Sequence, residues 1–168
     1  RRWGRQLEAS RSRPLPGIDE LYAALGEKLP PEQPPAIVHG DYRLDNVVVG
    51  ADDQVLAVLD WEMATLGDPL TDLGLLSVYE QLAPLFPGIN DAPTAPGFLR
   101  GEDTLAAYRA AGGRNLDHLG FYEALASFKL AVILEGIHLR HSRGLTAGTG
   151  FDGVGEAVPL LVDMGHRA

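Results

Sequence analysis

The sequence predicts an α+β fold that is mostly helical and contains a small β-hairpin. Three observations support this prediction. Apolar residues recur at helical spacing along most of the chain. Two short valine-rich runs flank a turn at residues 50–53, which is the pattern of a hairpin. Polar residues cluster just before the first run and just after the second, so we expect the hairpin to position the chemistry.

Helices are expected over residues 3–9, 18–25, 69–79, 102–111 and 116–141, and a last helix is expected to begin over residues 158–164. Asp19 and Glu20 lie in the first turn of the second helix, where the helix dipole favours acidic side chains. Pro69 suits the first turn of the third, because the missing N–H is not needed there. Residues 30–35 form a stiff, proline-rich connector.

The β insert is expected to consist of two strands at residues 47–49 and 55–59. Residues 36–38 lead directly into the polar cluster that precedes the first strand. Residues 84–101 are rich in proline and glycine and are expected to form a surface loop, and the glycine-rich residues 145–155 a mobile one.

Composition favours an ordinary soluble domain. The chain has 168 residues, of which 45% are hydrophobic and 22% are charged, so it can bury a substantial core. The absence of cysteine excludes disulfides and thiolate sites, and a net charge of −9 disfavours nucleic-acid binding. No apolar run reaches the roughly 18 residues of a membrane span, so we expect no membrane partner and a cytoplasmic location.

The polar cluster has the composition of a phosphoryl-transfer site. Asp41 precedes Asn46 by five residues, and Asp60 ends the second strand. Phosphoryl transfer needs a carboxylate that positions the acceptor, and it needs ligands for the metal that accompanies the nucleotide. Asp41 is the candidate base, and Asn46 and Asp60 offer the hard oxygen ligands that Mg²⁺ prefers.

These motifs resemble a known family. The residues that carry the resemblance are His39, Gly40, Asp41, Asn46, Leu59, Asp60, Trp61 and Glu62. The pattern resembles the aminoglycoside phosphotransferase and choline kinase group, a branch of the protein-kinase-like fold. Extended to Leu73, it is most similar to phosphotransferase domains that occur alone in bacteria or fused to acyl-CoA dehydrogenases. The resemblance implies transfer of the ATP γ-phosphate to a hydroxyl of a small molecule.

The resemblance also implies roles for individual residues. Asp41 would be the catalytic base, and Asn46 and Asp60 would hold Mg²⁺ and, through it, the nucleotide. Two further residues would support the loop: Asp72 by bracing its backbone, and His39 as a structural member rather than a proton carrier.

Arg43 stands where protein kinases often carry a lysine that approaches the transferred phosphate, and we expect the same electrostatic role here. Two roles remain open for Glu62, that of a solvated surface acid and that of a group close to the metal.

The half of a kinase that covers the phosphates is not evident. The only lysines are Lys28 and Lys129, and neither follows a suitable strand. We therefore expect residues 1–35 to form N-terminal helices and a connector, and residues 36–168 to form a kinase-like C-terminal lobe without its ATP-binding N-terminal lobe. Such a chain should have little activity alone, and its exposed apolar face would invite a homo-oligomer.

Two other functions remain open at this point. A metal-dependent hydrolase could use His39, Asp41 and Asp60 as ligands, although further ligands are not evident. A non-catalytic binding module could keep the kinase-like fold without its activity. The sequence leaves the acceptor open among an aminoglycoside, another amino-alcohol and a hydroxyacyl-CoA.

Overall fold

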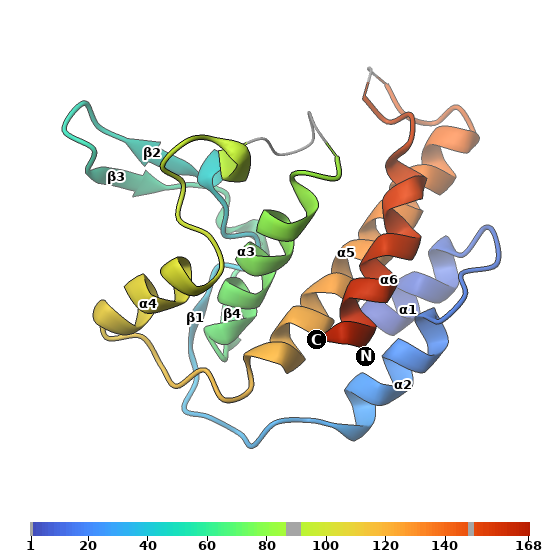
Figure 1. The fold of residues 1–168 in the computed structure, drawn as a ribbon. Helices are drawn as coiled ribbons and strands as arrows, with labels where there is room; N and C mark the ends of the chain where they lie inside the picture. Colours follow the sequence, from blue (N-terminus) through green and yellow to red (C-terminus); the bar gives the residue numbers. More distant parts are fainter. Residues whose placement is uncertain (1, 87–91, 148–149) are drawn as a thin grey trace. The chain divides into compact units, whose positions relative to one another are not determined.

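The computed structural model describes residues 2–86, 92–147 and 150–168. Its contacts divide the chain into two compact units (Figure 1). One unit combines Arg1–Pro30 with Ala124–Ala168, and the other is the continuous segment Pro31–Glu123. The expected division into residues 1–35 and 36–168 stays a prediction. None of the helices in the described part of the chain is long and apolar enough to cross a bilayer.

The first unit is helical. It contains α1 (Arg2–Ser10), α2 (Ile18–Glu27), the greater part of α5 (Leu119–Ser142), a short 3₁₀ turn η4 (Val154–Glu156) and α6 (Ala157–Arg167). Helix α2 packs against α6, and both bury apolar faces. Ile18, Phe128 and Leu161 are among its buried core residues. The unit therefore joins the two ends of the described chain through one hydrophobic core.

The second unit contains two antiparallel strand pairs, one nested inside the other. The outer pair joins β1 (Ala36–Val38) to β4 (Thr65–Gly67), and the inner hairpin joins β2 (Val47–Val49) to β3 (Val55–Val58). A register shift interrupts the inner pair between Val48 and Val49. Two loops separate the pairs, residues 39–46 before the hairpin and residues 59–64 after it. Each loop is thus held at both of its ends.

Helices complete this unit. They are α3 (Leu70–Leu82), α4 (Glu102–Ala110) and the first residues of α5. Gly74 of α3 lies against the backbone of Tyr122, where an added Cβ would come within 2.6 Å of a backbone carbon. The buried carboxylate of Glu80 accepts bonds from Gly101 N and Thr104 Oγ1, at 2.9 and 3.0 Å, so it caps the start of α4.

The fold confirms the predicted mixture of helices with a small β element, but several bounds differ. The long helix begins at Leu119 rather than at residue 116, and the last helix, expected to begin over residues 158–164, runs over Ala157–Arg167. The single expected hairpin is accompanied by the second pair β1·β4, which the sequence analysis missed. A three-residue strand such as β4 carries too little alternation to be recognised.

The two expected loops are only partly described. The loop at residues 84–101 contains a short 3₁₀ turn, η3 (Ala92–Thr94), and residues 87–91 lie outside the described residues. Residues 148–149 of the expected mobile loop also lie outside them, and its last residues belong to η4. The mobility of that loop stays a prediction.

Candidate active site

The nested strand pairs bring the two polar loops together. Leu59 N donates to the carbonyl of Asn46 at 2.8 Å, which ties the end of the first loop to the start of the second. Gly40 adopts a φ of 86°, and a Cβ there would lie 2.7 Å from the carbonyl oxygen of Met63. Only glycine accommodates both that backbone conformation and that approach. The predicted base and the predicted metal ligands therefore lie on two loops that touch.

Asp72 braces the first loop from helix α3. Its carboxylate accepts backbone N–H bonds from His39 at 2.7 Å and from Gly40 at 2.8 Å, one on each oxygen. Because both bonds go to backbone donors, Asp72 fixes the path of the chain rather than a side chain. The bracing role that the resemblance implies for Asp72 stays a prediction, and these two bonds are the contacts on which it would depend.

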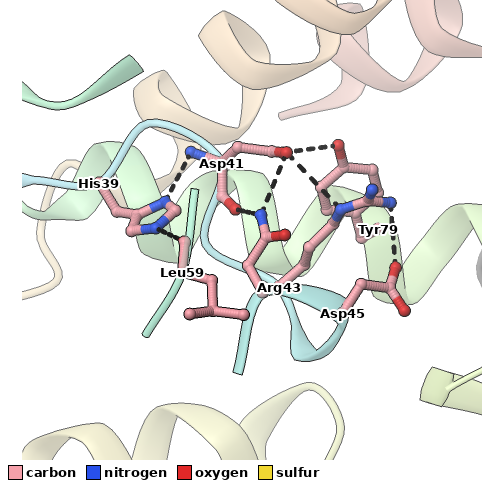
Figure 2. A network of polar contacts seen from close by, with 7 residues as sticks. His39, Asp41, Arg43, Asp45, Leu59 and Tyr79 are labelled. Carbon is pink, nitrogen blue, oxygen red and sulfur yellow. Dashed lines mark hydrogen bonds and ion pairs between the residues drawn. The ribbon is translucent and has the colours of Figure 1, made fainter. Parts of the chain in front are cut away.

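His39 is buried and connects the two loops. Its Nδ1 accepts the backbone N–H of Asp41 at 3.2 Å, so its Nε2 carries the proton and donates to the carbonyl of Leu59 at 2.7 Å (Figure 2). Both ring nitrogens are therefore engaged within the protein. This leaves His39 unsuited to ligate a metal, which disfavours the hydrolase alternative.

Asp41 presents a half-buried carboxylate that several side chains contact (Figure 2). Its Oδ1 accepts the hydroxyl of Tyr79 at 3.1 Å. Asn46 Nδ2 donates to the Asp41 carbonyl oxygen at 2.8 Å and approaches its Oδ2 at 3.4 Å. The amide nitrogen of the buried Asn46 thus turns toward Asp41, and its carbonyl oxygen is left for another partner.

Arg43 lies beside the same carboxylate. Its Nε is 3.6 Å from Asp41 Oδ2 and its Nη1 is 3.1 Å from Asp45 Oδ2. The guanidinium carbon also lies 5.7 Å from the centre of the Tyr79 ring, within cation–π range. Nε is buried and makes no hydrogen bond within the described part of the chain. A buried donor of this kind suits an anionic ligand.

Asp60 and Glu62 lie on the second loop and are exposed. Asp60 adopts the left-handed conformation, with φ 63° and ψ 56°, immediately before the 3₁₀ turn η2 (Trp61–Met63). Such a conformation is unfavourable for a residue with a Cβ and tends to occur where function requires it. Over the described residues, no three His, Asp or Glu side chains gather closely enough to form a metal cage.

Tyr79 was not among the predicted site residues and stood only at the end of the helix expected over residues 69–79. A signal was nevertheless present. Tyr79 follows Asp72 by seven residues, which is about two helical turns, so the two side chains project from one face of α3. A residue on the same helix face as a predicted loop brace is a candidate neighbour of that loop.

A cavity of about 550 Å³ lies within the same unit, lined by residues of α3, α4 and the start of α5. Its acidic groups already have partners. Glu80 caps α4, Glu123 accepts the hydroxyl of Ser77 at 2.5 Å, and the exposed Glu102 lies 4.0 Å from the guanidinium of Arg109. The carboxylates of this cavity are thus accounted for by the packing of the helices.

Comparison with protein families assigns the chain. The model of the phosphotransferase enzyme family matches residues 1–113, which include every predicted site residue. The chain belongs to this phosphotransferase family. Its fold is that of a kinase-like phosphotransferase. The match also confirms the resemblance drawn from the motif between His39 and Leu73.

Known proteins extend the assignment. A solved structure from Ralstonia eutropha, provisionally described as an aminoglycoside phosphotransferase, superposes with a TM-score of 0.81 at 32% identity. The similarity covers 99% of this chain and 52% of that one. Acyl-CoA dehydrogenase family member 11 of mouse is 37% identical over 149 residues, and family member 10 of mouse is 35% identical over 148.

The curated relatives are much longer than this member of the family. The matched region is 84% of this chain but only 19% of the mouse family member 11 and 14% of family member 10. The chain also spans about half of the Ralstonia protein. The similarity to acyl-CoA dehydrogenase family members was expected from the sequence, and the comparisons confirm it.

Proposed function

We propose that this phosphotransferase transfers the γ-phosphate of ATP to a hydroxyl group of a small molecule. Asp41 accepts the proton of that hydroxyl, and Arg43 offsets negative charge on the transferring group. Asn46 and Asp60 hold Mg²⁺ and thereby the nucleotide. The observation that supports the proposal is the backbone contact between the two loops, one of which carries Asp41 and Asn46 and the other Asp60.

The donor set fits Mg²⁺. This ion takes few protein ligands and keeps several waters or phosphate oxygens. The amide of Asn46 is oriented by its bonds to Asp41, so its carbonyl oxygen is left to the metal, and Asp60 supplies an exposed carboxylate. When bound, the ion would neutralise the phosphate charges and orient the nucleotide.

Asp41 has the arrangement that a base requires. Its carboxylate is restrained by neutral and cationic donors, yet each oxygen has acceptor positions to spare, so a substrate hydroxyl can still donate to it. The buried Nε of Arg43, which lacks a hydrogen bond to any described residue, supports a role toward the phosphoryl oxygens.

The first experiment is calorimetric titration with Mg²⁺–ATP, comparing the parent protein with Asp60→Asn. We expect the substitution to abolish or strongly weaken binding, because an amide replaces the anionic metal ligand. Asp53→Asn is the matched control, since Asp53 is the other described aspartate in the left-handed conformation, with φ 59°, and lies in the exposed turn of the hairpin. Equal binding by the two variants would contradict the metal assignment.

The proposed base is tested separately by phosphate transfer to a panel of hydroxyl acceptors. Asp41→Asn should lower kcat by about 100-fold or more, as expected for loss of a general base, and leave nucleotide binding intact. Arg43→Ala should lower turnover while the nucleotide still binds. Full activity in Asp41→Asn would exclude this residue as the base.

We further propose that transfer requires polypeptide outside this lobe. The support is that the chain spans only about half of the Ralstonia protein, and that a phosphate-covering loop is not evident in its sequence. The transfer assays therefore use the longest form of the protein that can be prepared. Robust transfer by the 168-residue chain alone would contradict this part of the proposal.

A further inference from the structure

Tyr79 contacts both Asp41 and Arg43, the two side chains to which the proposed function assigns catalytic roles. Its hydroxyl donates to Asp41 Oδ1 at 3.1 Å, and its ring lies 5.7 Å from the guanidinium carbon of Arg43 (Figure 2). We propose that Tyr79 is a positioning residue that holds both groups, its hydroxyl fixing the carboxylate and its ring fixing the guanidinium. This inference rests on the proposed function and adds a residue to it.

The hydroxyl limits rotation of the Asp41 carboxylate. Tyr79 engages Oδ1, while Asn46 and Arg43 approach Oδ2 at 3.4 and 3.6 Å. Tyr79 makes the shortest of these three side-chain contacts. Without it, the remaining contacts lie on one oxygen and are long, so the carboxylate could turn about its Cβ–Cγ bond. A base that turns away from the substrate hydroxyl is misaligned, and small misalignments lower reaction rates strongly.

The ring limits the position of Arg43 independently. Among the described residues, Arg43 has two ionic neighbours, Asp41 and Asp45, and both lie on its own loop. Tyr79 is the contact that joins Arg43 to helix α3. Since α3 also carries Asp72, which braces the loop backbone, one helix aligns both the backbone and the side chains of the proposed site.

Tyr79 is suited to act as a permanent donor. Burial, and then the negative charge of Asp41, raise the pKa of Tyr79 above its usual value. The phenol therefore keeps its proton throughout the physiological range. Its position on a regular helix also makes the donor rigid, as a positioning group requires.

Two substitutions separate the two roles. Tyr79→Phe removes the hydroxyl and keeps the ring, whereas Tyr79→Leu removes both. Tyr122→Phe is the matched control, because the hydroxyl of Tyr122 also bonds a carboxylate in the same unit, that of Asp68, which has no proposed part in transfer. Thermal unfolding of each variant verifies that the fold is retained before any other comparison.

The expected change in kcat follows from the two roles proposed for Tyr79, which are to fix the Asp41 carboxylate and to fix the Arg43 guanidinium. Tyr79→Phe should lower kcat about tenfold or more, with KM for nucleotide and acceptor changed less than about twofold, because alignment is lost but binding is not. Tyr79→Leu should lower kcat further, and Tyr122→Phe should match the parent protein. A raised KM at unchanged kcat would overturn the proposal, since it would make Tyr79 a substrate-binding group instead.

A spectroscopic readout does not depend on activity. In ¹H–¹⁵N spectra of the chain, Tyr79→Phe should shift the Asn46 side-chain amide, which bonds Asp41, and shift the Arg43 Nε–H less, because the ring beside Arg43 is kept. Tyr79→Leu should shift both, and Tyr122→Phe neither. Unchanged Asn46 and Arg43 signals in both Tyr79 variants would overturn the proposal.

The two readouts distinguish a failure of this inference from a failure of the proposed function. Shifted signals together with full turnover would overturn Tyr79 as a positioning residue while the proposed reaction stands. Absence of transfer in the parent protein would overturn the proposed function, and the signals would still decide whether Tyr79 holds the two side chains.

Discussion

At the scale of single residues, the backbone of the loop around Asp41 is held by a carboxylate that accepts hydrogen bonds from backbone N–H groups. Asp72 receives two such bonds, one on each oxygen, so both oxygens are needed as hydrogen-bond acceptors. Backbone N–H groups buried without a partner cost free energy, which makes this position sensitive to a nearly isosteric substitution.

We predict that Asp72→Asn destabilises the protein by about 1–3 kcal/mol, because the amide group would face a backbone N–H instead of accepting from it. Urea unfolding measures the change. Asp52→Asn, in the exposed turn between β2 and β3, serves as the control and should be nearly neutral. Equal stabilities for the two variants would show that the Asp72 carboxylate does not brace the loop.

A buried tyrosine predicts a dependence of stability on alkaline pH. Burial, and then the hydrogen bond to Asp68, raise the pKa of Tyr122 to about 12. The folded state therefore holds this proton more tightly than the unfolded state, whose tyrosine ionises near pH 10. The unfolding free energy should fall as pH rises from 10 to 12.

Denaturant midpoints at pH 9 and pH 11 measure this effect. Tyr122→Phe should reduce the loss of stability between the two values, since the substituted ring cannot ionise. An identical loss in the parent and in Tyr122→Phe would contradict the assignment to this residue.

At the scale of elements, much of the fold followed from local pattern, and the remainder depended on contacts distant in sequence. The helices and the β2–β3 hairpin were predictable because periodicity and turn residues lie within short windows. Strand β4 was not, since three residues acquire strand geometry only by pairing with β1, about thirty positions earlier. The same reason hid the contact of Tyr79 with Asp41.

The candidate site was predictable to a similar extent. The motif supplied the identities of the proposed base, ligands and brace, because these residue types at this spacing resemble a known family. Their geometry was not readable from the sequence. In particular, the engagement of both nitrogens of His39 depends on the position of the second loop.

The approach of the two loops predicts a graded effect of alanine at glycine positions. Gly40 and Gly112 have nearly equal φ values, 86° and 84°, but only Gly40 lies against another backbone. Gly112→Ala should cost about 1–2 kcal/mol for the left-handed backbone alone. Gly40→Ala should cost clearly more, because its Cβ would also meet Met63. Equal losses in urea unfolding would show that the loops are not closely packed.

Two helical glycines should respond with opposite signs. Gly74→Ala should destabilise by about 1–3 kcal/mol, because the added methyl would overlap the backbone of Tyr122. Gly26→Ala, in α2 with open space around it, should stabilise by about 0.5–1 kcal/mol through a better helix propensity. Thermal unfolding distinguishes them, and a stabilising Gly74→Ala would contradict the close crossing of α3 and α5.

At the scale of the whole molecule, the first unit is held together by a bond between distant parts of the chain. Glu135 on α5 is fully buried and accepts from Arg13 at 2.9 Å and from Ser12 at 2.9 Å. Arg13 also donates to the carbonyl of Gly155 at 2.6 Å. The segment between α1 and α2 is thereby attached to α5 and to the 3₁₀ turn η4 that precedes α6.

We predict that Arg13→Ala destabilises the protein by about 3 kcal/mol, because it leaves the Glu135 carboxylate buried without its cation. Combining Arg13→Met with Glu135→Leu should recover much of the loss, since an apolar pair of similar volume removes the buried charge as well. Chemical unfolding of the variants measures both effects. A double variant less stable than Arg13→Ala would contradict this explanation.

The first unit combines two segments that are far apart in the sequence, and this has a consequence for synthesis on the ribosome. Helices α1 and α2 are translated well before the parts of α5 and α6 that belong to the same unit, which follow more than ninety residues later. During that interval α2 lacks α6, the helix against which it packs, while the strands and α3 can already assemble. A ribosome-associated holdase should therefore crosslink to α2 in stalled nascent chains, and release it only once α6 has left the exit tunnel.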